Sequence, residues 1–105
     1  DDSLGWNAYN HTGTIPAHSH GTHVAGIVGA HSNNNNQVAG VNWQVQLMIV
    51  AGASSTTSTA MEAYSYILEQ KQRWIESAGS EGAFIVSVNS SFGVDNADCE
   101  SGNYP

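Results

Sequence analysis

Positive charge is almost absent from this sequence. Its 105 residues include 2 Lys+Arg against 9 Asp+Glu, which gives a formal net charge of -7 at pH 7. Nucleic acids and anionic membrane surfaces are bound through clustered Lys and Arg side chains, so we expect neither as a partner. No apolar run approaches the roughly 20 residues of a membrane-spanning helix. The acidic balance suits an exported protein, and we expect a secreted, extracellular one.

Cysteine is nearly absent too. Cys99 stands alone, so no disulfide can form within the chain. Either its partner lies in another part of a longer protein or the thiol is free, and the sequence leaves both open. The chain begins at Asp1 without Met, and we expect it to be a piece of a longer protein. A hydrophobic content of 40% is ordinary for a globular protein and argues against disorder.

Periodic hydrophobic patterns predict an α/β fold. Residues 60–78 repeat apolar side chains every three or four positions, which predicts a helix. The apolar runs 45–51 and 83–88 flank this helix and predict buried strands. A strand, a helix and a strand in this order form a βαβ unit, in which the strands are parallel. We interpret residues 1–19 as loop and short extended structure, and the four asparagines 33–36 as a turn.

The most informative stretch is residues 18–27, which read HSHGTHVAGI. Ser19 is a suitable N-cap for a helix from His20 to about His31. Each glycine along this helix lowers the stability of the helix by about 1 kcal/mol relative to Ala. A sequence tolerates that cost where another backbone approaches closely or a side chain must be held in place. The positive end of the helix dipole favours a neutral ring at His20, and a general base must be neutral.

Residues 20–26, HGTHVAG, resemble the histidine motif of the subtilisin-like serine proteases. In that family the first histidine of the motif is the general base of a Ser-His-Asp triad, and here it matches His20 rather than His23. The stretches VAGV at 38–41 and NSSFG at 89–93 also resemble family segments.

The resemblance implies a partial three-layer, parallel-sheet, subtilisin-like fold, with residues 1–105 a single fragment of the catalytic domain. The family's Asp lies upstream of the histidine in Asp-Ser-Gly or Asp-Thr-Gly, and its serine lies in Gly-Thr-Ser-Met-Ala. Neither motif occurs here. The resemblance therefore implies a serine endopeptidase by family whose isolated chain is inactive. The alternative is a non-catalytic, subtilase-like piece that binds peptides.

Two loops match the family segments that hold the substrate as an added strand. Ser55 and Thr56 follow the first predicted strand, and Ser91 and Gly93 follow the second. Main-chain hydrogen bonds to an extended peptide supply affinity in such sites. The competing interpretation is that both are ordinary loops without a ligand. The implied partners are a peptide or protein substrate and the remainder of the protease domain.

A calcium ion is the one cofactor that the resemblance suggests. The family often holds Ca²⁺ in the loop after the histidine helix, and Asn34, with Asn36 next, matches its side-chain ligand. Asp2 is the candidate carboxylate. Amide and carbonyl oxygens suit Ca²⁺, but a plain Asn-rich turn explains the loop equally well.

The histidines of residues 18–27 also suggest a zinc-binding module. This is the least favoured alternative, because residues i and i+2 of a helix do not face each other. We expect His23 to pack on the second face of its helix. Finally, exposed sheet edges and uncovered apolar faces predict self-association of the chain, for which strand exchange is one route.

Overall fold

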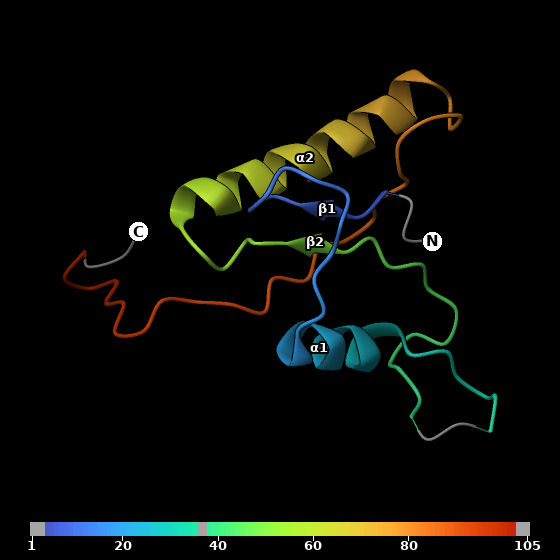
Figure 1. Cartoon of the computed structure of the whole chain (residues 1–105), viewed down its shortest axis with the longest axis horizontal. Coiled ribbons are helices and arrows are strands. Elements are labelled where there is room, and N and C mark those ends of the chain that lie inside the picture. Colours follow the sequence, from blue (N-terminus) through green and yellow to red (C-terminus); the bar gives the residue numbers. More distant parts are fainter. Residues whose placement is uncertain (1–3, 36–37, 103–105) are drawn as a thin grey trace.

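Two short parallel strands and two helices form the regular structure of the computed structural model, which describes residues 4–35 and 38–102 (Figure 1). In chain order they are β1 (Trp6–Asn7), α1 (Ser19–Gly29), β2 (Val50–Ala51) and α2 (Thr57–Glu76). The strands pair in parallel, with Trp6 opposite Val50 and Asn7 opposite Ala51. The chain is thus α/β, and Figure 1 shows the two helices on opposite sides of the strand pair.

The sequence predicts a βαβ unit from residues 45–51, 60–78 and 83–88, but other segments form this unit in the structure. It runs β1, α1, β2, whereas the predicted strand 83–88 belongs to no ladder among the described residues. One edge of β2 is taken by β1, because Trp6 N donates to Ile49 O and Ala8 N to Ala51 O, each at 3.0 Å. Of the predicted strand 45–51, only Val50–Ala51 forms a strand in the structure.

The side chain of Asn7 fixes the turn that ends β1. It is 3% exposed, and its Oδ1 accepts from Tyr9 N at 3.0 Å and from Asn10 N at 3.1 Å. Its Nδ2 donates to Thr14 O at 3.2 Å. A buried amide must find such partners, since leaving it unpaired costs about 1–3 kcal/mol. The loop 8–14 is folded back by these side-chain bonds together with two backbone bonds between Asn7 and Thr12, at 2.7 and 3.3 Å.

Helix α1 begins and ends slightly earlier than predicted. His18, not Ser19, is the N-cap: its backbone is extended and its Nδ1 accepts from His20 N at 3.3 Å. The helix ends at Gly29 because residues 40–42 come back to its last carbonyls. Val41 N donates to Ile27 O at 2.9 Å, and Gly40 N donates to Ala30 O at 3.1 Å.

Two glycines permit this close return. A Cβ at Gly40 would collide with the backbone N of Ala30, and one at Gly29 would collide with Cγ1 of Val45. At Gly29 the close neighbour of an added Cβ is a side chain, whereas the close backbone approach expected of the histidine helix is made by Gly40 to Gly29 and Ala30. At Gly21 and Gly26 no atom lies within 4 Å of the added Cβ.

Helix α2 is the longest element. Thr56 caps it, accepting from Thr59 N at 3.2 Å, so that it begins three residues before the predicted start. Beyond Glu76 the chain turns through left-handed conformations at Ala78 (φ 52°) and Gly79 (φ 88°). Tyr66 joins α2 to the start of the chain, because its hydroxyl donates to Leu4 O at 2.9 Å.

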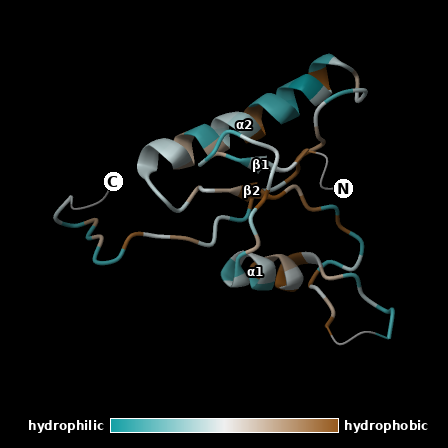
Figure 2. Cartoon of the chain, viewed as in Figure 1, coloured by the Kyte–Doolittle hydropathy of each residue, from teal (hydrophilic) through white to brown (hydrophobic). Residues whose placement is uncertain are grey.

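Little of the described chain is buried. Among its apolar side chains only Ala8 and Ala63 are buried. The accessible surface is 7932 Å², whereas a compact monomer of this mass exposes about 5,700 Å². The radius of gyration is 15.6 Å, against about 13 Å for a compact domain of this length. Figure 2 shows hydrophobic residues along open segments of the chain.

None of the described helices has the length and hydrophobicity needed to cross a lipid bilayer.

Candidate functional site

His20 lies at the start of α1 with its side chain exposed. The helix start is held by His18, whose carbonyl accepts from Thr22 N at 2.9 Å while its ring accepts from His20 N at 3.3 Å. The His20 ring is not used in this cap. It is therefore presented to the surroundings by a fixed backbone, as a proton-transfer group must be.

The other histidines of the motif do not form a metal centre with it. His23 is exposed rather than packed, so the expectation of a buried position on the second helix face is wrong. The cause is the thin core, in which no large side chain of the described residues is fully buried. Within residues 4–35 and 38–102 there is no group of three or more His, Cys, Asp and Glu side chains that could hold a metal ion.

The first predicted substrate segment follows β2. Ser55 closes a turn onto Gly52, with its N at 3.1 Å and its Oγ at 2.8 Å from Gly52 O. Thr56 Oγ1 caps α2 and lies 2.9 Å from Thr59 Oγ1. Both side chains are exposed and are engaged in local hydrogen bonds that order the loop.

The second predicted substrate segment lies in the exposed chain after residue 88. Ser91 Oγ accepts from Asn89 Nδ2 at 2.7 Å. The neighbouring Ser90 ties the segment to α2, since its Oγ lies 2.6 Å from Tyr64 Oη. Around Gly93 nothing lies within 4 Å of an added Cβ. One side of the segment is therefore open to an incoming chain.

The predicted calcium loop is described only in part. Asn34 is exposed, between Asn33 (φ 57°) and Asn35 (φ 58°) in left-handed conformations. The other candidates, Asp2 and Asn36, lie outside the described residues.

These candidates are not joined into one constellation by direct contacts. In the described part of the chain, no hydrogen bond or ion pair links His20 to Ser55, Thr56 or Ser91. Cys99 is exposed with a free thiol.

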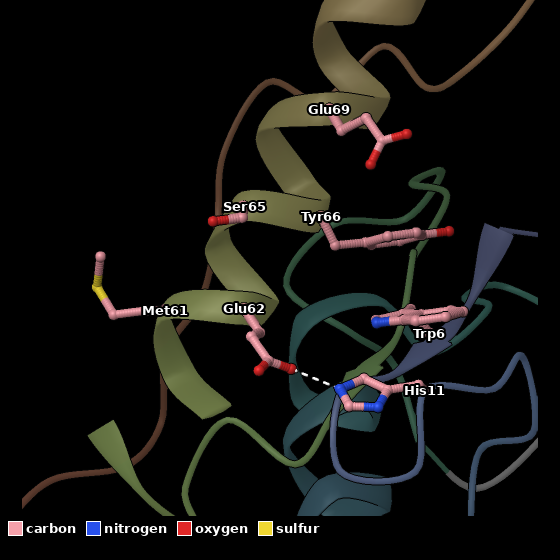
Figure 3. Close-up of a pocket in the computed structure, with 7 residues that line it drawn as sticks. All are labelled: Trp6, His11, Met61, Glu62, Ser65, Tyr66 and Glu69. Carbon is pink, nitrogen blue, oxygen red and sulfur yellow. Dashed lines mark hydrogen bonds and ion pairs between the residues drawn. The ribbon is translucent and has the colours of Figure 1, made fainter. Parts of the chain in front are cut away.

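A shallow groove that the sequence did not predict lies between the start of the chain and α2 (Figure 3). Its wall is the stacked pair of Trp6 and Tyr66, whose ring centroids are 5.0 Å apart. At its lower end His11 Nε2 lies 2.7 Å from Glu62 Oε2. Burial, and secondarily the nearby Glu69 carboxylate, raises the pKa of Tyr66.

This groove does not hold a catalytic triad. It contains a histidine, a carboxylate and Ser65, but Figure 3 shows the Ser65 side chain pointing away from the His11 ring. The His11–Glu62 pair is also largely exposed, at 65% and 52%. A solvated pair of this kind contributes little to stability, about 0–1 kcal/mol. This pair could not be predicted from a local sequence pattern, because His11 and Glu62 are 51 positions apart.

In a comparison with protein families, the model of the subtilase family, peptidase family S8, aligns with residues 3–103. The chain belongs to the subtilase family. Comparison with curated proteins and with solved structures gave no match. The family assignment extends the resemblance carried by HGTHVAG over almost the whole chain. By family, then, the chain is of the serine peptidase type.

Proposed function

We propose that this subtilase chain is part of the catalytic domain of a secreted serine endopeptidase, with His20 as its general base. In this chemistry the imidazole takes the proton of the attacking serine hydroxyl and later gives it to the leaving amine. The observation that supports the role is the exposed ring at the first turn of α1, in the motif HGTHVAG.

The remainder of the domain supplies the Asp and the Ser. The support is the open surface of this chain, which exposes about 2,300 Å² more than a compact monomer of its mass. In the proposed three-layer fold, further strands and helices cover part of this surface. The isolated chain is then inactive, because it has neither an orienting carboxylate for His20 nor a nucleophile.

The proposed substrate is an extended peptide held between two loops. Gly93, with no neighbour within 4 Å of an added Cβ, lets the substrate backbone approach, while Ser91 and the turn at Ser55 and Thr56 flank it. Peptides held in this way gain affinity from main-chain hydrogen bonds.

A bound Ca²⁺ is the further proposal for the loop after α1, with Asn34 and Asp2 as ligands. Carboxylate and amide oxygens are the donors that Ca²⁺ takes. Thermal melting with and without millimolar Ca²⁺ tests this. An upward shift that is lost in Asn34→Ala supports the site, and an unchanged melting temperature contradicts it.

A serine-directed phosphonate probe tests the catalytic proposal. It labels a serine only when a neighbouring base activates the hydroxyl. We expect the complete domain to be labelled, His20→Ala to lose labelling, and His23→Ala, a change three residues away on the same helix, to retain it. Equal labelling of both variants would contradict the assignment. Peptide binding by a complete domain that is never labelled would favour the non-catalytic alternative.

A further inference from the structure

Residues 89–93, NSSFG, are tied to α2 by one pair of side chains. We call these residues the second substrate segment. Tyr64 Oη of α2 lies 2.6 Å from Ser90 Oγ, across 26 positions of the sequence. In the described part of the chain, this is the one hydrogen bond that joins residues 86–93 to another segment. The position of the second substrate segment relative to α2 therefore depends on this contact.

The two ends of this contact differ in how firmly they are held. Tyr64 lies within the 20-residue helix α2, whose backbone is fixed by its own hydrogen bonds. Ser90 is exposed and lies in neither a helix nor a strand. A segment without such bonds samples many backbone conformations, and fixing it in one of them has an entropic cost. The contact with Tyr64 thus transfers order from the helix to the segment.

A second hydrogen bond acts inside the segment. Asn89 Nδ2 donates to Ser91 Oγ at 2.7 Å, so the Ser91 hydroxyl is oriented by its neighbour and takes no part in the contact with α2. No atom lies within 4 Å of an added Cβ at Gly93, and the Ser91 side chain is exposed. The segment is therefore held through Ser90, whereas Ser91 and Gly93, the residues proposed to flank the peptide, are left accessible.

We propose that Tyr64 is a positioning residue for peptide binding, which acts by holding Ser90 and so keeping the second substrate segment in its binding conformation. This role rests on the proposed function, because it requires that a peptide binds beside Ser91 and Gly93. When only a fraction of the molecules has the binding conformation, the apparent dissociation constant rises by the inverse of that fraction. A segment that is ordered in advance avoids this loss of affinity. In this role the phenol touches neither the substrate nor the reacting atoms.

Steady-state kinetics on the complete domain test the positioning role, with fluorescein-labelled casein as the substrate. Tyr64→Phe should raise KM about three- to tenfold, the range expected for the loss of one hydrogen bond. It should change kcat less than about twofold, because the base at His20 is not affected. Ser90→Ala should raise KM equally, and the double variant should add nothing further, since both changes remove the same bond. Ser90→Thr keeps the hydroxyl and should retain the parental KM.

Tyr66→Phe is the matched control. Tyr66 lies two positions along the same helix, and its hydroxyl donates to Leu4 O at 2.9 Å and not to the second substrate segment. We expect this substitution to lower stability and to leave KM unchanged. Tyr64→Phe should do the reverse, because Ser90 is exposed and water replaces its lost partner. A purely structural role of Tyr64 would not separate KM from the melting temperature in this way.

A direct binding measurement separates failure of the positioning role from failure of the catalytic role. In a His20→Ala background, where we expect no cleavage, fluorescence anisotropy should show weaker binding of labelled casein by Tyr64→Phe than by Tyr66→Phe. A domain that binds casein without cleaving it, and binds it more weakly when Tyr64 is changed, would contradict the catalytic role of His20 and support the positioning role.

Three outcomes would overturn the positioning role. In the first, the parent domain cleaves casein while Tyr64→Phe and Ser90→Ala keep the parental KM and affinity, which leaves the catalytic role intact. In the second, Tyr64→Phe and Tyr66→Phe lose affinity equally. In the third, the complete domain neither cleaves nor binds casein, which contradicts both roles.

Discussion

The indole of Trp6 and the phenol ring of Tyr66 stack with 5.0 Å between their centroids and 13° between their planes. This contact, with the bond from the Tyr66 hydroxyl to Leu4 O at 2.9 Å, joins α2 to the strand pair. In a chain with so little buried apolar surface, a stacked aromatic pair is a major part of what holds the elements together. Such pairs contribute about 0.5–1.5 kcal/mol beyond the area that they bury.

Tyr66→Phe should lower the free energy of unfolding by about 1 kcal/mol, because it leaves the Leu4 carbonyl without its partner and keeps the ring. Denaturant titration followed by circular dichroism measures the change. Tyr64→Phe is the matched control: Tyr64 lies on the same helix and its hydroxyl meets the exposed Ser90 at 2.6 Å. We expect it to change stability by less than about 0.5 kcal/mol. Equal effects of the two substitutions would contradict this account.

Alkaline pH should weaken the fold through Tyr66. Burial and the Glu69 carboxylate raise its pKa in the folded chain above the ordinary value of 10.0. Below pH 10 the phenol is neutral in both states and contributes no pH dependence. Above it, the unfolded chain loses the proton more readily, so the free energy of unfolding falls as pH rises. Melting temperatures across this range should fall less in Tyr66→Phe, and an identical fall in both proteins would refute the assignment.

Gly40→Ala should destabilise the return of the chain over the end of α1. The added Cβ would collide with the backbone N of Ala30, and relief of such a collision by backbone shifts costs about 1–3 kcal/mol. Gly93→Ala is the control, because nothing lies within 4 Å of its added Cβ. Its effect on stability should stay within about 0.5 kcal/mol. Thermal melts of both variants measure the difference, and a Gly40→Ala protein as stable as the parent would contradict the packing.

The helices were predictable from the sequence because their signals are local. Apolar residues at three- and four-residue steps predicted α2 within a few residues of its observed bounds, Thr57–Glu76. The strands were not predictable in the same way. β1 has two residues, Trp6 and Asn7, too few for any alternation, and its pairing is set by backbone bonds to a segment more than forty residues away. The run 83–88 has strand composition, but a ladder requires a partner as well.

The candidate site likewise has one part that could be predicted from the sequence and one part that could not. His20 could be located from its motif and the helix that follows, and it stands at the start of that helix. The groove beside Trp6 and Tyr66 could not, since the loop that brings His11 to Glu62 is shaped by the buried Asn7 side chain. The contact of His11 with Glu62 joins positions 51 residues apart, and a contact between such distant positions leaves no periodic pattern in the sequence.

We propose that His20 is the general base of a serine endopeptidase. The most direct measurement is kcat/KM for a peptide substrate in the complete domain, compared among the parent, His20→Ala and His23→Ala. We expect His23→Ala to keep most of the activity. We expect His20→Ala to lower kcat, and kcat/KM with it, on the order of a million-fold, which is the loss in kcat found when subtilisin itself loses its base. A His20→Ala domain that turns over peptide like the His23→Ala control would contradict the assignment.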